Sequence, residues 1–133
     1  MCKIGDIILV DSYKTHGKTM NQHSFIVLED NNGNIRGLDY DMVGIVMSSF
    51  KDEKQKLEKM KFPGNFPLSF KEQNIFDGGN GKDGFIKTEQ FYYFNKNKIN
   101  LRVIGYMQED VFEQIIKFIS ELKIPLEQIT ENL

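Results

Sequence analysis

The chain has 133 residues, of which 40% are hydrophobic and 27% charged, a size and composition that indicate one soluble domain and exclude a multidomain protein. One cysteine and two histidines exclude a disulfide scaffold and a zinc module, and without a signal peptide or an apolar run of about 20 residues we expect a cytoplasmic protein with no membrane contact. The net charge of −2 argues against a nucleic-acid partner, but residues 103–133 alone carry six acidic and two basic residues.

The first part of the chain predicts three strands and one long loop. Residues 4–10 are apolar and rich in β-formers, which indicates a buried strand, whereas residues 11–22 are polar and aperiodic. A loop of that length in a compact domain is often functional. Residues 24–29 predict a second strand, and the Asn-Gly pair within residues 30–34 predicts a turn into a third strand at residues 35–38.

The middle of the chain predicts a strand followed by an exposed helix. Residues 42–47 form an apolar run that ends at the hydroxyls of Ser48 and Ser49. Residues 51–61 are helix formers with almost nothing to bury. Ser49, with Asp52 three positions later, fits the N-terminal cap of this helix.

The second half of the chain predicts more strands and a terminal helix. Apolar residues at helical spacing, with acids in the first turn and a proline beyond the end, predict a helix over residues 109–123. The other elements expected here are one short strand within residues 68–76, a flexible loop at residues 77–84 and strands at residues 85–88, 90–94 and 99–106.

Together these elements predict one α+β domain over residues 1–133. Its strongly bent antiparallel sheet forms a half-closed barrel, with a short mid-chain helix and a C-terminal helix. Residues 51–61 and 82–102 each carry five basic residues, against three and two acidic ones. The domain can therefore present a basic surface despite its net negative charge.

Polar side chains that can carry chemistry stand at the ends of two predicted strands. His23 directly precedes one strand, and Ser48, Ser49 and Lys51 follow another. If those strands are neighbours, an imidazole, two hydroxyls and an ammonium face one cleft, a set that suits an anionic substrate. Cleavage of a phosphodiester by the adjacent 2′-hydroxyl needs a base, an acid and donors for the charge on phosphate, and these residue types supply them without a metal ion.

Each of these signals also has a structural explanation. A histidine such as His23 is more often a surface residue at a strand edge, and Ser48 and Ser49 are more often a strand end or a helix cap. The lysines of residues 51–61 are more often a solvated helix face, and the aromatic residues 91–94 are more often core. Only their joint placement at strand and loop ends favours a functional site.

Three segments of the chain resemble the MazF/PemK-like superfamily of toxin endoribonucleases. They are residues 3–11, which contain a Gly-Asp strand opening, residues 23–28, and residues 83–90, which end in Glu89-Gln90. The resemblance implies a bent SH3-like barrel with a terminal helix. In MazF-type members the second strand begins with Arg-Pro, where this chain has His23-Ser24, and the catalytic hydroxyl of the fourth strand corresponds to Ser48.

The segment from Ser48 to Lys51 resembles more closely the Thr-Ser-Pro-Lys segment of the ToxN/CptN group. That resemblance implies a type III toxin–antitoxin pair, in which a small structured RNA holds the toxin inactive, and we favour it over a type II pair with a protein antitoxin. The expected partners are a substrate mRNA and this RNA antitoxin, in a homo-oligomer or a protein–RNA assembly. No cofactor is expected.

The expected reaction is sequence-specific cleavage of single-stranded RNA, without a metal ion, to a 2′,3′-cyclic phosphate and a 5′-hydroxyl. His23 is predicted to be the acid or base, and Ser48, Ser49 and Lys51 to hold the phosphate. The residues predicted to contact RNA from the polar segment are Tyr13, Lys14, His16, Lys18 and Gln22.

Two other classes of protein remain as alternatives. A CcdB-like protein of the same barrel poisons its target by binding alone and needs neither His23 nor Ser48. An SH3-like adaptor would expose an apolar groove, whereas the polar segment at residues 11–22 predicts a polar and basic rim.

Overall fold

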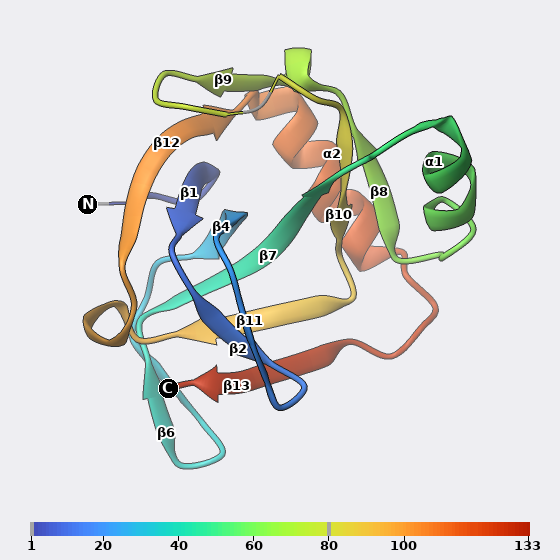
Figure 1. Cartoon of the computed structure of the whole chain (residues 1–133). Helices are drawn as coiled ribbons and strands as arrows, with labels where there is room; N and C mark the ends of the chain where they lie inside the picture. Colours follow the sequence, from blue (N-terminus) through green and yellow to red (C-terminus); the bar gives the residue numbers. More distant parts are fainter. Residues whose placement is uncertain (1, 80) are drawn as a thin grey trace.

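The structure, a computed structural model, describes residues 2–79 and 81–133, so Asn80 of the predicted loop lies outside the described residues. Nine strands of the described chain form one curled sheet, in which β13, β11, β7, β4, β1, β12 and β9 are successive neighbours and β10 joins β7 to β8 (Figure 1). The predicted half-barrel of mostly antiparallel strands is confirmed. The strands are β1 (Asp6–Val10), β4 (His23–Glu29), β7 (Met42–Ser49), β8 (Asn65–Leu68), β9 (Gln73–Ile75), β10 (Gly84–Lys87), β11 (Gln90–Phe94), β12 (Leu101–Met107) and β13 (Glu127–Asn132).

Two hairpins outside the main sheet correct the sequence prediction. Residues 11–22 form strands β2 (Tyr13–Thr15) and β3 (Lys18–Met20) instead of a loop, with a turn at His16 and Gly17, whose φ angles are 50° and 75°. The turn between β5 (Gly33–Ile35) and β6 (Leu38–Tyr40) lies at Arg36 and Gly37, within the strand predicted at residues 35–38, and not within residues 30–34 as predicted. Strands of three residues are too short to show a period in the sequence.

The mid-chain helix α1 (Glu53–Lys59) has no buried residue, as predicted, but Ser49 does not cap it. The N-cap is Asp52, whose carboxylate accepts a hydrogen bond of 2.8 Å from the Gln55 backbone N–H. Short 3₁₀ turns follow at two places: η1 (Phe70–Glu72) separates β8 from β9 within the predicted strand at residues 68–76, and η2 (Lys96–Lys98) joins β11 to the loop before β12.

The C-terminal helix α2 (Glu109–Ser120) lies across one face of the sheet (Figure 1). Val111 and Ile115 are its buried residues, and they pack against a cluster that includes Ile7, Ile26 and Ile45 from three adjacent strands. The helix ends three residues before the predicted limit. None of the helices in the described part of the chain is long and apolar enough to span a membrane.

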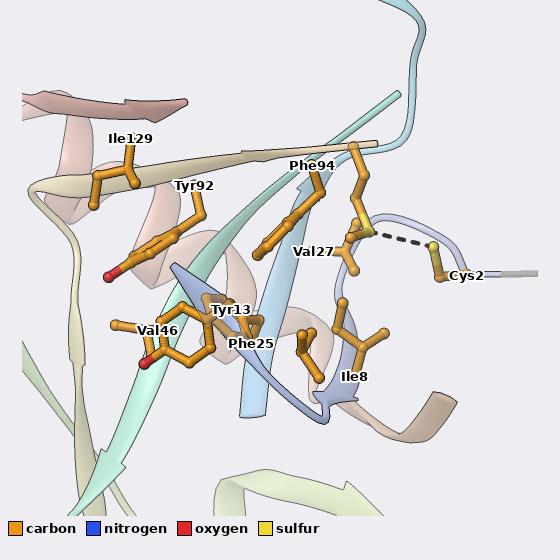
Figure 2. Packing of buried hydrophobic residues seen from close by; sticks show 11 residues of the cluster. Cys2, Ile8, Tyr13, Phe25, Val27, Val46, Tyr92, Phe94 and Ile129 are labelled. Carbon is orange, nitrogen blue, oxygen red and sulfur yellow. Dashed lines mark hydrogen bonds between the residues drawn. The ribbon is translucent and has the colours of Figure 1, made fainter. Parts of the chain in front are cut away.

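The second core cluster is built around aromatic rings (Figure 2). Phe25 contacts Tyr13, Tyr92 and Phe94 edge-on, with ring centroids 5.0, 5.1 and 5.2 Å apart. Ile129 of β13 closes the cluster beside Tyr92. The aromatic residues of β11 are therefore split between two environments: Tyr92 and Phe94 are buried, whereas Phe91 and Tyr93 are half-buried.

Strand β13 is an element that sequence analysis did not predict. It pairs in parallel with β11, whereas the sheet is otherwise antiparallel in the pairs that the structure describes. Its sequence, Glu-Gln-Ile-Thr-Glu-Asn, has one apolar residue, Ile129, and therefore no hydrophobic pattern. Tertiary packing, rather than β-propensity, makes this segment a strand.

The buried tyrosines predict a loss of stability at alkaline pH. Burial, and the neighbouring Tyr92, raise the pKa of Tyr13, and burial raises that of Tyr92 from the ordinary value of 10.0. The native state holds both phenol protons more tightly than the unfolded chain does. The stability that the two protonated tyrosines contribute is therefore complete below pH 10, and it is lost as the pH rises through their raised native pKa values. Urea unfolding should show a steeper alkaline decline for the wild type than for the Tyr13→Phe Tyr92→Phe double variant; equal declines would contradict this assignment.

Candidate functional site

Strands β4 and β7, whose ends carry two of the predicted site residues, are neighbours in the sheet. Phe25 pairs with Val46 in these antiparallel strands, and the same register continued by two residues sets His23 opposite Ser48. On the far side of β7, Phe85 of β10 is the partner of Ser48. The two strands that carry the predicted imidazole and hydroxyls are thus neighbours.

An open cavity of about 760 Å³ lies at this end of the sheet. Its walls come from β1, β4, β7, α1, β8, β9, β10 and β12, which lie in the upper half of Figure 1. No Asp or Glu is present among its lining residues in the part of the chain that the structure describes. Its basic lining residues are His23, Lys59, Lys82, Lys87 and Arg102. A concave site of this composition attracts anions.

The imidazole of His23 has a defined orientation. Its Nδ1 lies 3.1 Å from the backbone oxygen of Asn21, and because a carbonyl only accepts, Nδ1 carries the proton of the neutral ring. The ring of Tyr13 contacts the imidazole edge-on, with centroids 5.6 Å apart. The remaining ring nitrogen, Nε2, is then the atom that can accept a proton from a substrate.

The two predicted hydroxyls lie where the backbone of β10 comes very close to β7. Ser48 and Ser49 line the cavity, the first half-buried and the second exposed. Gly84 pairs with Ser49, and a Cβ built on Gly84 would lie 2.0 Å from the backbone oxygen of Ser48. Only glycine fits at this position, so Gly84 determines how closely β10 covers the serine-bearing end of β7.

The structure divides the other predicted site residues into two groups. Gln22 lines the cavity beside His23. Lys51 is exposed beside α1, where its backbone N–H donates to Gln55 Oε1, and within the described chain it is not among the lining residues.

The remaining predicted RNA contacts lie on the β2–β3 hairpin, next to β13 in the lower half of Figure 1. Tyr13 is buried there, with 5% of its surface exposed. His16 pairs with Glu127 at 2.6 Å between Nε2 and Oε2, and the exposed Lys14 and Lys18 share this hairpin. Among the described residues, these four do not line the cavity.

Four cationic residues that line the cavity are not among the site residues predicted from the sequence, although they belong to its two basic stretches. Lys59 comes from residues 51–61, and Lys82, Lys87 and Arg102 come from residues 82–102. The sequence signal for these residues was the local excess of basic over acidic side chains in the two stretches. Which of these side chains share a site depends on the pairing of β10 and β12 with strands from the first half of the chain. In the described part of the chain, no group of three or more His, Cys, Asp or Glu side chains is placed to hold a metal ion.

Comparison with known proteins identifies one family. A family model described as PemK-like, MazF-like toxin of type II toxin-antitoxin system matches residues 3–122. No curated protein and no solved structure is similar enough to the chain to count as a match. The matched range includes every residue that lines the cavity.

Replacement of Gly84 by alanine should disturb the serine end of the cavity. The added Cβ would collide with the backbone of Ser48, so β10 must move away, at a cost of about 1–3 kcal/mol in unfolding free energy. Amide NMR shifts of Ser48 and Ser49 should change in this variant. Gly37→Ala is the control, because nothing lies within 4 Å of its added Cβ and only left-handed backbone strain is introduced. Unchanged serine shifts in Gly84→Ala would contradict the close approach.

Proposed function

Because the chain belongs to the PemK-like, MazF-like toxin family, we propose that it is an endoribonuclease toxin that cleaves single-stranded RNA without a metal ion. The observation that carries this proposal is the cavity at the end of β4 and β7, which is lined by basic side chains and contains His23 and Ser48. A non-enzymatic binder of the same fold does not need an imidazole opposite a hydroxyl in such a cavity.

The charge of the cavity fits RNA better than the charge of the whole chain does. Contacts to phosphates dominate the affinity of proteins for nucleic acids, and they depend on local cations. The net charge is −2, but Lys59, Lys87 and Arg102 line the cavity from three different elements. RNA laid across this site can therefore contact cations on α1, β10 and β12.

The proposed chemistry starts from the neutral imidazole of His23. Nε2 takes the proton of the ribose 2′-hydroxyl, O2′ bonds to phosphorus, and the bond from phosphorus to O5′ breaks. The products are a 2′,3′-cyclic phosphate and a 5′-hydroxyl, whose proton comes from a protonated lining group or water. Ser48 and Ser49 donate to the phosphate oxygens, and the lining cations stabilise the added negative charge. A phosphate contact by Lys51 stays a prediction.

Removal of the imidazole should slow cleavage without abolishing RNA binding. In a buffer with EDTA, we expect the wild type to cut a mixed single-stranded RNA to cyclic-phosphate ends, and His23→Ala to be slower by about 10²- to 10⁴-fold. Ser48→Ala should be slower by about 10²-fold. Fragment end groups and fluorescence anisotropy with a non-cleavable RNA measure the two properties. A folded wild type that binds RNA but leaves it intact would overturn the proposal in favour of a binding protein.

The cationic lining is tested by a pair of variants with the same change in charge. Arg102→Ala removes a cation from the cavity, whereas Lys98→Ala removes one from η2, outside the lining of the described chain. Only the first should weaken RNA binding, and the dependence of log K on log salt should become shallower by about 0.7 for each phosphate that Arg102 neutralises. Equal effects of the two variants would indicate that RNA does not bind in the cavity.

The type of antitoxin distinguishes two versions of this function. The matched family is described as type II, which favours a protein antitoxin. The segment from Ser48 to Lys51 motivates the alternative of a structured RNA antitoxin, with the toxin processing that RNA.

Purification of the toxin with its natural operon should separate the two versions. A type II toxin should become active when a protease digests the acidic protein bound to it. A type III toxin should instead be bound to a small RNA with a 2′,3′-cyclic phosphate end. Recovery of the bound component by gel filtration, followed by ribonuclease or protease treatment, identifies which partner is present.

A further inference from the structure

The family model ends at residue 122, but the chain beyond that point still folds against the domain core. In β13, Ile129 and Asn132 have 4% and 8% of their surface exposed. Ile129 belongs to the aromatic cluster (Figure 2), and Asn132 bonds to the β2–β3 hairpin. The segment beyond the family match is thus an integral strand of this protein.

Asn132 joins β13 to the hairpin through both ends of its side chain. Its Oδ1 accepts a hydrogen bond of 2.7 Å from the Lys14 backbone N–H, and its Nδ2 donates one of 3.0 Å to the Lys14 backbone oxygen. One residue earlier, the Glu131 carboxylate accepts a bond of 3.1 Å from the Gly17 backbone N–H. Lys14 is in register with Thr19 of β3, and the amide of Asn132 bonds both the N–H and the carbonyl of its backbone from β13.

The residues on either side of Lys14, Tyr13 and Thr15, contact the core residue Tyr92. Thr15 accepts a hydrogen bond of 3.2 Å from the Tyr92 hydroxyl. The Tyr13 ring lies edge-on to both Tyr92 and His23, with centroids 5.5 and 5.6 Å away. The strand outside the family match is thus connected through Asn132, Lys14 and Tyr13 to the imidazole at the cavity.

We propose that β13 positions the His23 imidazole, with Asn132 and Tyr13 as positioning residues that do not contact RNA. Tyr13 holds the ring from one side, and the Asn21 carbonyl, at the end of the same hairpin, holds Nδ1. This arrangement keeps Nε2 as the proton acceptor and fixes its direction. The inference rests on the proposed nuclease function, in which His23 transfers the proton.

The first test compares a variant without the Asn132 amide with a variant that destabilises β13 but keeps the hydrogen bonds to Lys14. Asn132→Ala should lower kcat by about 10- to 100-fold and change KM by less than about twofold, because a small misplacement of a catalytic group slows the reaction without weakening substrate binding. Ile129→Val, which costs about 1 kcal/mol in the same strand and keeps the Lys14 hydrogen bonds, should retain the wild-type kcat. Equal kcat values for wild type and Asn132→Ala would overturn the proposal.

The second test separates the ring of Tyr13 from its hydroxyl. Tyr13→Phe keeps the ring that contacts His23, so its kcat should be higher than that of Tyr13→Leu, which should be as low as that of Asn132→Ala. A Tyr13→Phe variant as slow as Tyr13→Leu would assign a direct role to the hydroxyl and contradict positioning by the ring.

Nitrogen NMR of the His23 imidazole gives a readout that needs no activity. The wild type should show one tautomer, protonated at Nδ1, and Asn132→Ala should show a mixture of the two. If the wild type cuts no RNA but this change is seen, the nuclease function fails and the positioning by β13 stands. If the wild type cuts RNA, but Asn132→Ala and Tyr13→Leu both show the wild-type tautomer and kcat, only the positioning proposal fails.

Discussion

The antiparallel register of β4 against β7 is the constraint on which the candidate site depends. Continued two residues past the Phe25–Val46 pair, it sets His23 opposite Ser48. The register is fixed at several points, because the buried residues of both strands belong to two core clusters on opposite faces. Side chains alternate between faces with a period of two, so a slip by one residue would turn Phe25 and Ile26 to the wrong faces. The hydrophobic core therefore determines the geometry of the polar site.

The sequence was sufficient to predict the half-barrel, α2 and the strand ends that carry His23 and Ser48. The two strands are continuous apolar runs bounded by these polar residues, and α2 has apolar residues at helical spacing. The sequence was insufficient for the hairpins and β13. In three-residue strands and in a polar segment with a single buried isoleucine, the stabilising contacts are made with residues far away in the chain. The same reason explains the cationic lining: Lys59, Lys87 and Arg102 meet only after four separate strand pairings have formed.

The uneven distribution of charge along the chain has a structural counterpart. Two of the acidic residues near the C-terminus, Glu127 and Glu131, face the β2–β3 hairpin, where they pair with His16 and with the Gly17 backbone N–H. Both belong to β13, which Figure 1 draws in the lower half of the view, whereas α1, β8 and β9, which contribute to the cavity wall, are drawn in the upper half. The fold keeps these two carboxylates away from the cationic cavity, although Arg102 at its wall lies 3.5 Å from the Asp77 carboxylate.

The bond between Lys14 and Asn132 spans 118 positions of the chain. All strands from β3 to β12 lie between these two residues in the chain. Because contacts of high sequence separation carry a larger loop-closure cost than local strand pairs, we expect β13 to join the hairpin late in refolding.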